Sequence, residues 1–220
     1  MKLQKNLSTF KGPGLHGLPS ANYKCAACSD SGYIEVFNPQ GVKLGIAPCK
    51  CELRRAKIRK FGDLFADKSL ENYEGRNASM REAVGYIRRH IGESFYIYGD
   101  VGLGKTHLLA GIYDKLFKGN QWQTTGVFKE NALLNAVKTE NLIARVRDYT
   151  GFIIDDLGKV KLAPWETEAL FNFYDDVYRF EKMVVISSNY SLQDIAAYYG
   201  GAIARRIEER ATIIKIEGGK

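Results

Sequence analysis

The stretch FYIYGDVGLGKTHLL, residues 95–109, decides the fold. Its first four residues are apolar and predict a short buried strand, and the apolar residues after Thr106 recur at helical spacing. Between strand and helix lies the spacing Gly99-x4-Gly104-Lys105-Thr106. Backbone N–H groups of such a glycine-rich turn, together with the helix N-terminus, bind phosphate oxygens. The stretch therefore predicts a P-loop that binds ATP.

Different atoms of this loop suit different parts of the nucleotide. We expect Lys105 to hold the β and γ phosphates and to take part in catalysis, and we expect the Thr106 hydroxyl to bind Mg²⁺. The alternative, a glycine-rich turn with a chance Lys-Thr pair, does not explain the flanking strand and helix. The loop residues expected to contact the cofactor are Gly99, Asp100, Val101, Gly102, Leu103, Gly104, Lys105, Thr106 and His107.

Two later apolar runs end in polar residues. In FIIDDLG, residues 152–158, Asp155 is expected to contact the nucleotide and bind Mg²⁺, directly or through water, and Asp156 to polarise the attacking water. In VVISSN, residues 184–189, Asn189 is placed to hydrogen-bond that water or the γ-phosphate. The alternative for Asn189 is a turn or the cap of the next helix. Open parallel sheets bind ligands at the carboxyl ends of their strands, so these residues are expected to meet the P-loop.

Apolar runs alternate with helical patterns after residue 60, which is typical of βαβ units around a parallel sheet. This pattern indicates an α/β fold. A late helix is expected to carry several arginines on one element. The predicted strands are 95–98, 126–129, 152–154, 183–187 and 211–216; the predicted helices include 131–147, 164–179 and one with Arg205, Arg206 and Arg210.

The residues before this region predict a different kind of unit. Residues 1–24 are rich in glycine and proline and predict an irregular arm. The run ELRRAKIRK, residues 52–60, predicts a basic linker helix. Between them, YIEVF at residues 33–37 precedes turn-forming residues and predicts a β-hairpin. We therefore predict two domains, an N-terminal module over residues 1–60 and an ATPase domain over residues 61–220.

Four cysteines lie in the N-terminal module, as Cys25-x2-Cys28 and Cys49-x-Cys51. Four thiolates at the ends of a hairpin suit a structural Zn²⁺, and a unit this small needs such a metal to fold. The Cys-x-Cys spacing is tighter than the common Cys-x2-Cys. One alternative is therefore that only three of the cysteines bind the metal and that Glu52 or water is the fourth ligand. The other alternative is that the cysteines are free or redox-active thiols.

The composition narrows the class of protein. The 220 residues are 45% hydrophobic and 26% charged, which is ordinary for a globular chain. No run approaches the ~18–20 apolar residues of a membrane span, so we expect a cytoplasmic protein without a membrane partner. Disulfides are rare in that compartment, which favours a metal site for the cysteines. The formal net charge of +7 suits an anionic partner such as nucleic acid.

With these residues in place, the chain resembles the AAA+ ATPases of the DnaC/DnaI type, which are bacterial or phage helicase loaders. It is also similar to the IstB transposition ATPases. The resemblance covers roughly residues 68–218. It rests on SLENYEG (69–75), GDVGLGKTHL (99–108), IIDDLGKVK (153–161) with Trp165, VYRFEKMVVISSN (177–189) and GGAIARRIEER (200–210).

The resemblance implies a sheet in strand order 5-1-4-3-2 without a full C-terminal lid. A neighbouring subunit would complete each ATP site, so self-assembly through these sites is expected. The roles that the resemblance implies are a Walker B pair at Asp155 and Asp156, a sensor-1 residue at Asn189 and an arginine finger at Arg206, with Arg205 and Arg210 as alternatives.

The function implied is the loading of a replicative DNA helicase onto single-stranded DNA, with slow, partner-regulated ATP hydrolysis. The cysteine module is expected to contact the helicase, and loose candidates for the DNA face are Phe128, Lys129, Arg147 and Tyr149. Three alternatives stay open. They are an IstB-like transposition helper, a small-molecule kinase, and a non-catalytic zinc adaptor that only binds nucleotide.

Overall fold

The computed structural model describes residues 24–118, 124–139 and 141–218, so the predicted irregular arm lies outside the described residues except for Lys24. The chain divides into two compact units, Met1–Ala56 and Lys57–Lys220. Helix α1, Lys50–Phe61, runs through this division and contains the predicted basic helix. The predicted domain boundary after residue 60 falls near the end of the same helix.

The N-terminal unit is built on the predicted hairpin. Strands β1 (Tyr33–Phe37) and β2 (Lys43–Pro48) pair antiparallel. The Asn38 side chain closes the turn between them, because its Oδ1 accepts hydrogen bonds from the backbone N–H groups of Gln40 and Val42 at 3.0 and 2.8 Å. An asparagine is suited to this position because its short side chain can bond to the backbone two residues on.

The second unit holds a five-stranded parallel sheet in the order β4-β5-β6-β3-β7. Counted within this unit, the order is 2-3-4-1-5, which is the predicted 5-1-4-3-2 starting from the other edge. The predicted α/β class and strand order are therefore confirmed. The strands are β3 (Phe95–Tyr98), β4 (Thr125–Lys129), β5 (Gly151–Leu157), β6 (Met183–Ser188) and β7 (Thr212–Lys215).

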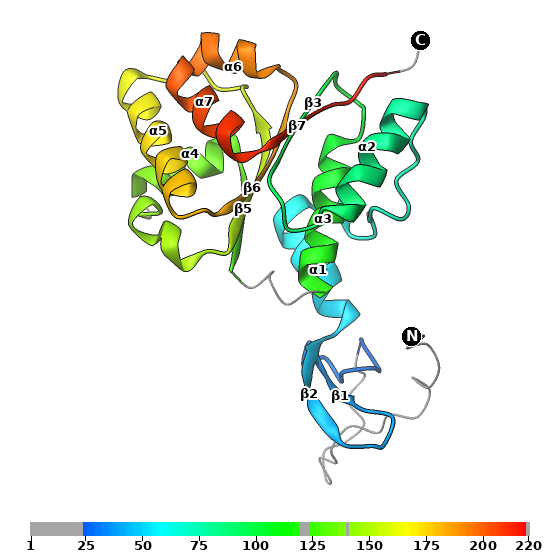
Figure 1. The fold of residues 1–220 in the computed structure, drawn as a ribbon. Coiled ribbons are helices and arrows are strands. Elements are labelled where there is room, and N and C mark those ends of the chain that lie inside the picture. The colour runs from blue at the N-terminus through cyan, green and yellow to red at the C-terminus, as the bar shows by residue number, and fades with distance from the viewer. Residues whose placement is uncertain (1–23, 119–123, 140, 219–220) are drawn as a thin grey trace. The chain divides into compact units, whose positions relative to one another are not determined.

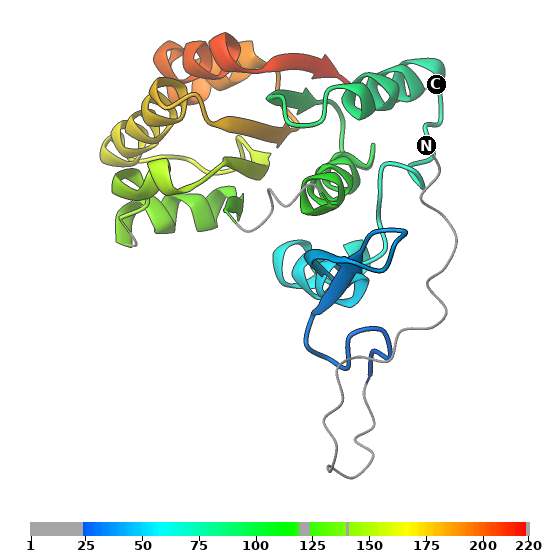
Figure 2. The same cartoon turned by 60° about the horizontal axis from the view of Figure 1, so that its bottom comes forward.

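Helices cover both faces of this sheet. Figure 1 shows α2 and α3 on one face and α4 to α7 on the other, and Figure 2 shows the same two layers after rotation. Two 3₁₀ helices, η1 (Asp63–Phe65) and η2 (Ile143–Asp148), lie in connections. The α-helices of this unit are α2 (Ala78–Arg89), α3 (Lys105–Lys118), α4 (Glu130–Thr139), α5 (Pro164–Arg179), α6 (Leu192–Tyr199) and α7 (Gly201–Arg210).

The sheet and the α4–α7 layer share one apolar core. Alternate residues of β5 and β6 face this layer, because successive side chains of a strand point to opposite sides. Each large apolar side chain buried there contributes about 1.5–3 kcal/mol. The core includes Phe152 and Ile154 of β5, Val184 and Ile186 of β6, and Leu133, Leu170, Phe173, Ile195 and Ile207 of the helices. Among the described residues, no helix is long and apolar enough to span a bilayer.

Two predicted elements differ from the structure. The single helix predicted over residues 131–147 is wrong, since α4 ends at Thr139 and Asn141 adopts a left-handed conformation with φ 51° before η2 begins. A helix cannot continue through such a residue. Strand β5 is longer than predicted, running to Leu157 rather than Ile154, with a register shift between these two residues.

Candidate nucleotide-binding site

Two glycines of the P-loop, Gly99 and Gly104, lie where a side chain does not fit. A Cβ atom at Gly99 would lie 2.1 Å from the carbonyl oxygen of Ile216, and one at Gly104 would lie 2.9 Å from the ring of Tyr73. Lys105 follows and is buried, and its Nζ donates hydrogen bonds to the carbonyl oxygens of Gly99 and Asp100 at 2.6 and 2.8 Å. The ammonium is therefore held inside the curve of the loop.

Burial also acts on the charge of Lys105. It lowers the pKa of the ammonium, because a charge is disfavoured away from water, and the nearby carboxylates of Asp156 and Asp100 oppose this effect. A bound anion at this place would act in the same direction as the carboxylates. The site thus favours an anionic ligand at the Lys105 ammonium.

Residues 69–73, which precede the first strand of the sheet, contact the P-loop and the start of its helix. The Tyr73 hydroxyl donates to the carbonyl oxygen of Leu103 at 2.6 Å. His107 Nε2 lies 2.9 Å from the carbonyl oxygen of Ser69, which only accepts, so this nitrogen carries a proton. The rings of Tyr73 and His107 pack edge to face. His107 therefore packs against the same segment as the P-loop, and burial there lowers the pKa of its imidazole.

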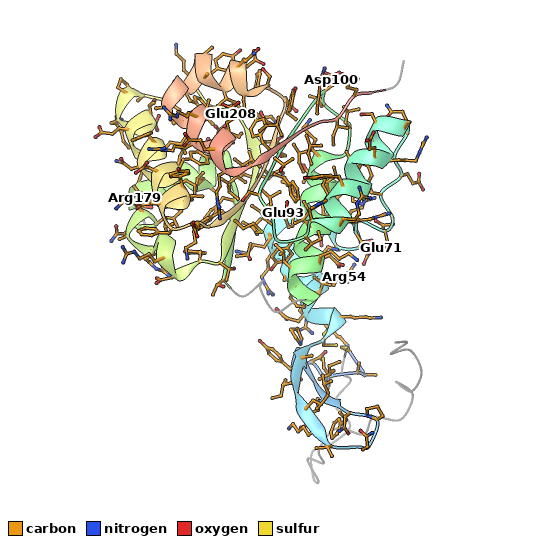
Figure 3. All side chains as sticks on the ribbon, viewed as in Figure 1. Arg54, Glu71, Glu93, Asp100, Arg179 and Glu208 are labelled. Atoms are coloured by element: carbon orange, nitrogen blue, oxygen red, sulfur yellow. The ribbon has the colours of Figure 1, made fainter. Side chains whose placement is uncertain are left out.

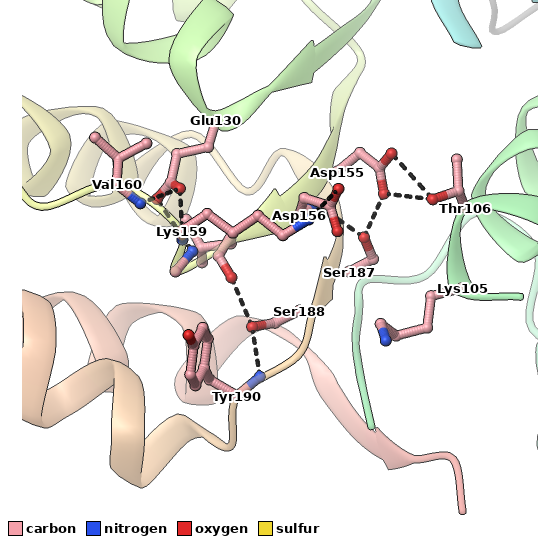
Figure 4. A network of polar contacts seen from close by, with 12 residues as sticks. Lys105, Thr106, Glu130, Asp155, Asp156, Lys159, Val160, Ser187, Ser188 and Tyr190 are labelled. Atoms are coloured by element: carbon pink, nitrogen blue, oxygen red, sulfur yellow. Dashed lines mark hydrogen bonds and ion pairs between the residues drawn. The ribbon is translucent and has the colours of Figure 1, made fainter. Parts of the chain in front are cut away.

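Asp155 joins the P-loop helix to the end of β6. Its carboxylate accepts hydrogen bonds from the Thr106 hydroxyl at 3.1 Å and from the Ser187 hydroxyl at 2.5 Å (Figure 4). Asp155 is 4% exposed, and burial raises its pKa although the Ser187 hydrogen bond lowers it. A hydroxyl and a carboxylate side by side are oxygen ligands of the kind that Mg²⁺ prefers, so the donor set fits this ion.

Asp156 faces different surroundings from its neighbour. It lies at the register shift of β5 with φ 63°, a conformation uncommon for a residue other than glycine. Its N–H donates to the Ser187 hydroxyl at 3.0 Å, and its carboxylate pairs with Lys159 Nζ at 2.8 Å (Figure 4). The bulge therefore separates the two carboxylates, since one is buried against Thr106 and the other is partly exposed beside Lys159.

One residue of this site was not predicted from the sequence. Glu130 is 3% exposed, and its carboxylate accepts hydrogen bonds from the N–H groups of Gly158, Lys159 and Val160 at 2.8–3.1 Å. The Tyr199 hydroxyl donates to the same carboxylate at 2.5 Å. In the sequence, an acidic residue at the start of a helix resembles an ordinary solvent-exposed N-terminal residue, so no signal reveals this role.

A comparison with protein-family models identifies the family of this domain. The model of the bacterial DnaA ATPase domain matches residues 75–205, which contain the P-loop, the two aspartates and Glu130. The chain belongs to this family. The AAA+ relationship expected from the sequence is thereby confirmed, and the cysteines lie before the matched residues.

Curated relatives of this DnaA-type ATPase domain are replication initiators. The chain is 29% identical over 108 residues to the chromosomal replication initiator protein DnaA of Acholeplasma laidlawii, covering 45% of this chain and 24% of the relative. It is 31% identical over 113 residues to DnaA of Deinococcus radiodurans, covering 48% and 24%. The chain thus matches about a quarter of the length of these relatives.

Solved structures with the same fold include helicase loaders. The DnaC helicase loader is 22% identical, with a TM-score of 0.62 over 70% of this chain and 98% of that one. DnaI is 20% identical, with a TM-score of 0.56 over 68% and 91%. A DnaA bound to AMPPCP and single-stranded DNA is 19% identical, with a TM-score of 0.55 over 69% and 50%. These likenesses establish a shared fold.

In this DnaA-type domain, Asn189 lies directly after β6 and is half-buried. The alternative that Asn189 caps the following helix is wrong. Ser191 is the N-cap of α6, and its hydroxyl accepts a hydrogen bond from the N–H of Asp194 at 3.2 Å. Asn189 therefore lies at the same carboxyl edge of the sheet as the P-loop.

The helix that carries the three arginines, α7, ends at the edge of the sheet away from the P-loop. β7 begins just after α7, and its first residue Thr212 lies beside Phe95, at the amino edge of the sheet. Figure 3 shows Glu93 at this end of β3 and Asp100 at the other. Arg210 lines a pocket together with Glu93.

The arginines differ in their partners. Arg206 pairs with Asp175 and Glu209, each at 2.9 Å, and its guanidinium lies over the ring of Tyr178. Arg205 has a side chain 74% exposed, also paired with Glu209. Arg210 donates to the carbonyl oxygens of Lys182 and Glu181. Arg205 is thus the most accessible of the three side chains, while Arg206 is bound to α5.

The four cysteines of the N-terminal unit lie together. One sulfur from each residue falls within 4.8 Å of the others, and two of the cysteines, Cys28 and Cys49, are buried. The Sγ atoms of Cys25 and Cys49 are 3.7 Å apart, and those of Cys28 and Cys51 are 3.4 Å apart. The Cys-x-Cys spacing therefore brings both of its sulfurs into the cluster, and the donor set fits a tetrahedral Zn²⁺.

Proposed function

We propose that the chain is an AAA+ ATPase that loads a replicative DNA helicase onto single-stranded DNA. The observation that carries the proposal is the contact of Thr106 with Asp155 beside the buried Lys105, in a fold shared with the DnaC helicase loader over nearly all of that chain. ATP-dependent remodelling by this fold needs a site for phosphate, metal and attacking water, and each has a candidate residue here.

Each residue of the nucleotide site then has one role. Lys105 binds the β and γ phosphates, with the N–H groups of residues 100–106 around them. Thr106 and Asp155 hold Mg²⁺, which neutralises charge on the phosphates when bound. Asp156, half-exposed and near Lys105, orients and polarises the attacking water, and Asn189 at the next strand end assists it.

A second subunit completes this site. Arg206 remains the proposed arginine finger, with Arg205 and Arg210 as alternatives, and their helix α7 ends with Arg210 at the amino edge of the sheet. Their proposed target is the nucleotide of a neighbouring subunit. For Arg206 this requires release from Asp175, whereas Arg205 is already exposed. The proposal therefore includes self-assembly through the ATP sites.

The N-terminal unit supplies the docking surface for the helicase. Cys25, Cys28, Cys49 and Cys51 hold a structural Zn²⁺, and the hairpin presents apolar side chains to solvent. Leu44 and Ile46 of β2 are 66% and 62% exposed, and Tyr33 of β1 is 44% exposed. Exposed apolar side chains gathered on one hairpin favour a protein partner over solvent alone.

Single-stranded DNA is the proposed second partner. The net charge of +7 favours a polyanion, and one solved structure of the same fold is a DnaA bound to single-stranded DNA. Of the candidate DNA residues, Lys129 and Arg147 are exposed, whereas Phe128 and Tyr149 pack against the apolar core. Phosphate contacts by the charged pair therefore have more support than base stacking by the aromatic pair.

Two measurements test this function. Purified chain is expected to hydrolyse ATP slowly, faster with single-stranded DNA, and Asp156→Asn is expected to lower the rate at least about tenfold. Asp63→Asn, at an exposed aspartate of η1 outside the nucleotide site, is the matched control for folding. The chain is also expected to co-purify with the replicative helicase of its source cell in the presence of ATP.

The outcomes separate the alternatives. Failure to bind the helicase with or without ATP would refute helicase loading and favour a transposition-helper role. Full activity of Asp156→Asn would favour the adaptor that binds nucleotide without hydrolysing it.

A further inference from the structure

The loop after Asp156 is fixed from two sides. At its start, the Ser188 hydroxyl donates to the carbonyl oxygen of Leu157 at 2.7 Å. Beyond it, Glu130 accepts the N–H groups of three consecutive residues, 158–160. Tyr199 adds a hydrogen bond from α6 to the same carboxylate. The backbone of residues 157–160 is therefore held in one place by buried groups.

This fixed backbone carries the charged side chain of Lys159. Lys159 lies in the middle of the loop, and its Nζ reaches back to the Asp156 carboxylate at 2.8 Å. The Lys159 side chain is 51% exposed and that of Asp156 34% exposed. Exposed ion pairs of this kind are weak because water screens them. The ammonium can thus leave Asp156 without any change in the backbone.

The ion pair between Lys159 and Asp156 limits how well Asp156 can orient the attacking water. A carboxylate orients water best when its oxygens are free to accept from it, and an ammonium paired with one oxygen occupies that oxygen. Figure 4 shows Asp156 and Lys159 in the same view as Lys105, and the charges of both act on the Lys105 ammonium. A competing anion at the surface would free Asp156.

We propose that Lys159, positioned by Glu130, restrains Asp156 and is drawn off by the phosphates of single-stranded DNA, which couples DNA binding to ATP hydrolysis. This inference rests on the proposed function. Lysine binds phosphate as a point charge, and each DNA strand offers a row of phosphates, so a weak exposed pair is the kind of contact that DNA can displace. Glu130 is a positioning residue in this scheme, since it acts through the loop.

The test compares ATP hydrolysis by the full chain with and without an oligo-dT strand at low salt. Lys159→Ala is expected to raise the basal kcat about two- to fivefold, the range set by the weakness of an exposed pair, with little change in KM for ATP. Addition of oligo-dT is expected to raise the rate of this variant no further. A variant that were merely misfolded would lose activity instead.

Three single variants and one double variant separate positioning from general damage. Lys159→Arg keeps a cation on Asp156 and is expected to behave like wild type. Lys161→Ala, an exposed lysine two residues further on, is expected to keep both the low basal rate and the response to DNA. Glu130→Gln is expected to raise the basal rate, and its combination with Lys159→Ala to raise it no more than Lys159→Ala alone.

A basal rate of Lys159→Ala at or below wild type, or an undiminished response of that variant to oligo-dT, overturns the coupling while leaving the ATPase proposal standing. A wild-type chain that hydrolyses no ATP overturns both.

Discussion

At the scale of single residues, the two neighbouring aspartates of β5 differ in their surroundings, since Asp155 is buried beside Thr106 and Asp156 is partly exposed beside Lys159. Their position after an apolar run predicted a strand end beside the P-loop, and Asp155 indeed contacts Thr106. The run did not reveal the bulge at Asp156, because a left-handed residue depends on Ser187 and the neighbouring strand. Glu130 was missed for the same reason, since its partners lie about thirty residues later.

Asp155→Asn separates stability from function at this scale. Burial raises the pKa of Asp155, so its ionised form is destabilising in the folded chain, and the amide is expected to keep or raise the urea midpoint at pH 7. Nucleotide hydrolysis is expected to fall at least about a hundredfold, because the proposed Mg²⁺ loses a charged ligand.

The pH dependence of the unfolding free energy is the control for this assignment of Asp155. The folded pKa lies above the usual value of about 3.9, so the stability from protonated Asp155 is present below that value and is lost as pH rises through the folded pKa. Asp155→Asn is expected to remove this loss in urea titrations across that window. A lower midpoint than wild type at neutral pH would contradict the assignment of a buried charge.

At the scale of elements, local signals predicted the helices and strands that begin or end with a strong marker. Pro164 opens α5, and that helix ends at Arg179 as predicted. The break after Thr139 carries no proline or glycine, and the left-handed Asn141 that marks it is one residue type among several that tolerate this conformation. The sheet order followed from the family resemblance, since periodicity alone does not order strands.

Tyr199→Phe tests the link between α6 and the loop after β5. The hydroxyl is buried and donates to Glu130, so its removal leaves a buried carboxylate with one donor fewer and is expected to cost about 1–3 kcal/mol of unfolding free energy. Tyr198→Phe on the same helix is the matched control, because Tyr198 is 60% exposed and should change stability by less than about 0.5 kcal/mol. Equal urea midpoints for the two variants would argue against the link.

At the scale of the whole molecule, the chain combines two units that are stabilised in different ways. The C-terminal unit has an extended apolar core between its sheet and helices. The N-terminal unit has a two-stranded hairpin, and several of its apolar side chains are exposed. A hairpin alone is marginal in water, so this unit depends on the cysteine cluster.

Cys49→Ser is expected to remove a ~1:1 zinc content and to unfold the hairpin, because three thiolates and a hydroxyl bind zinc more weakly than four thiolates. Nucleotide affinity is expected to stay within about twofold of wild type, since the P-loop belongs to the other unit. Metal analysis, hairpin amide signals in NMR spectra and nucleotide titration measure these effects, with a chelator on wild type as the parallel arm. Unchanged hairpin signals after zinc loss would contradict a structural metal.

The placement of the arginines at the sheet edge opposite the P-loop has a geometric consequence. A contact that joins the arginine edge of one copy to the nucleotide edge of the next is heterologous, so an assembly built from it has polarity. At one end of an open chain of such copies, the nucleotide site of the last subunit receives no arginine from a neighbour. At the other end, the arginines of the last subunit contact no nucleotide. The number of competent sites is then one fewer than the number of subunits, and the two exposed ends offer different surfaces for growth, capping or capture by a partner.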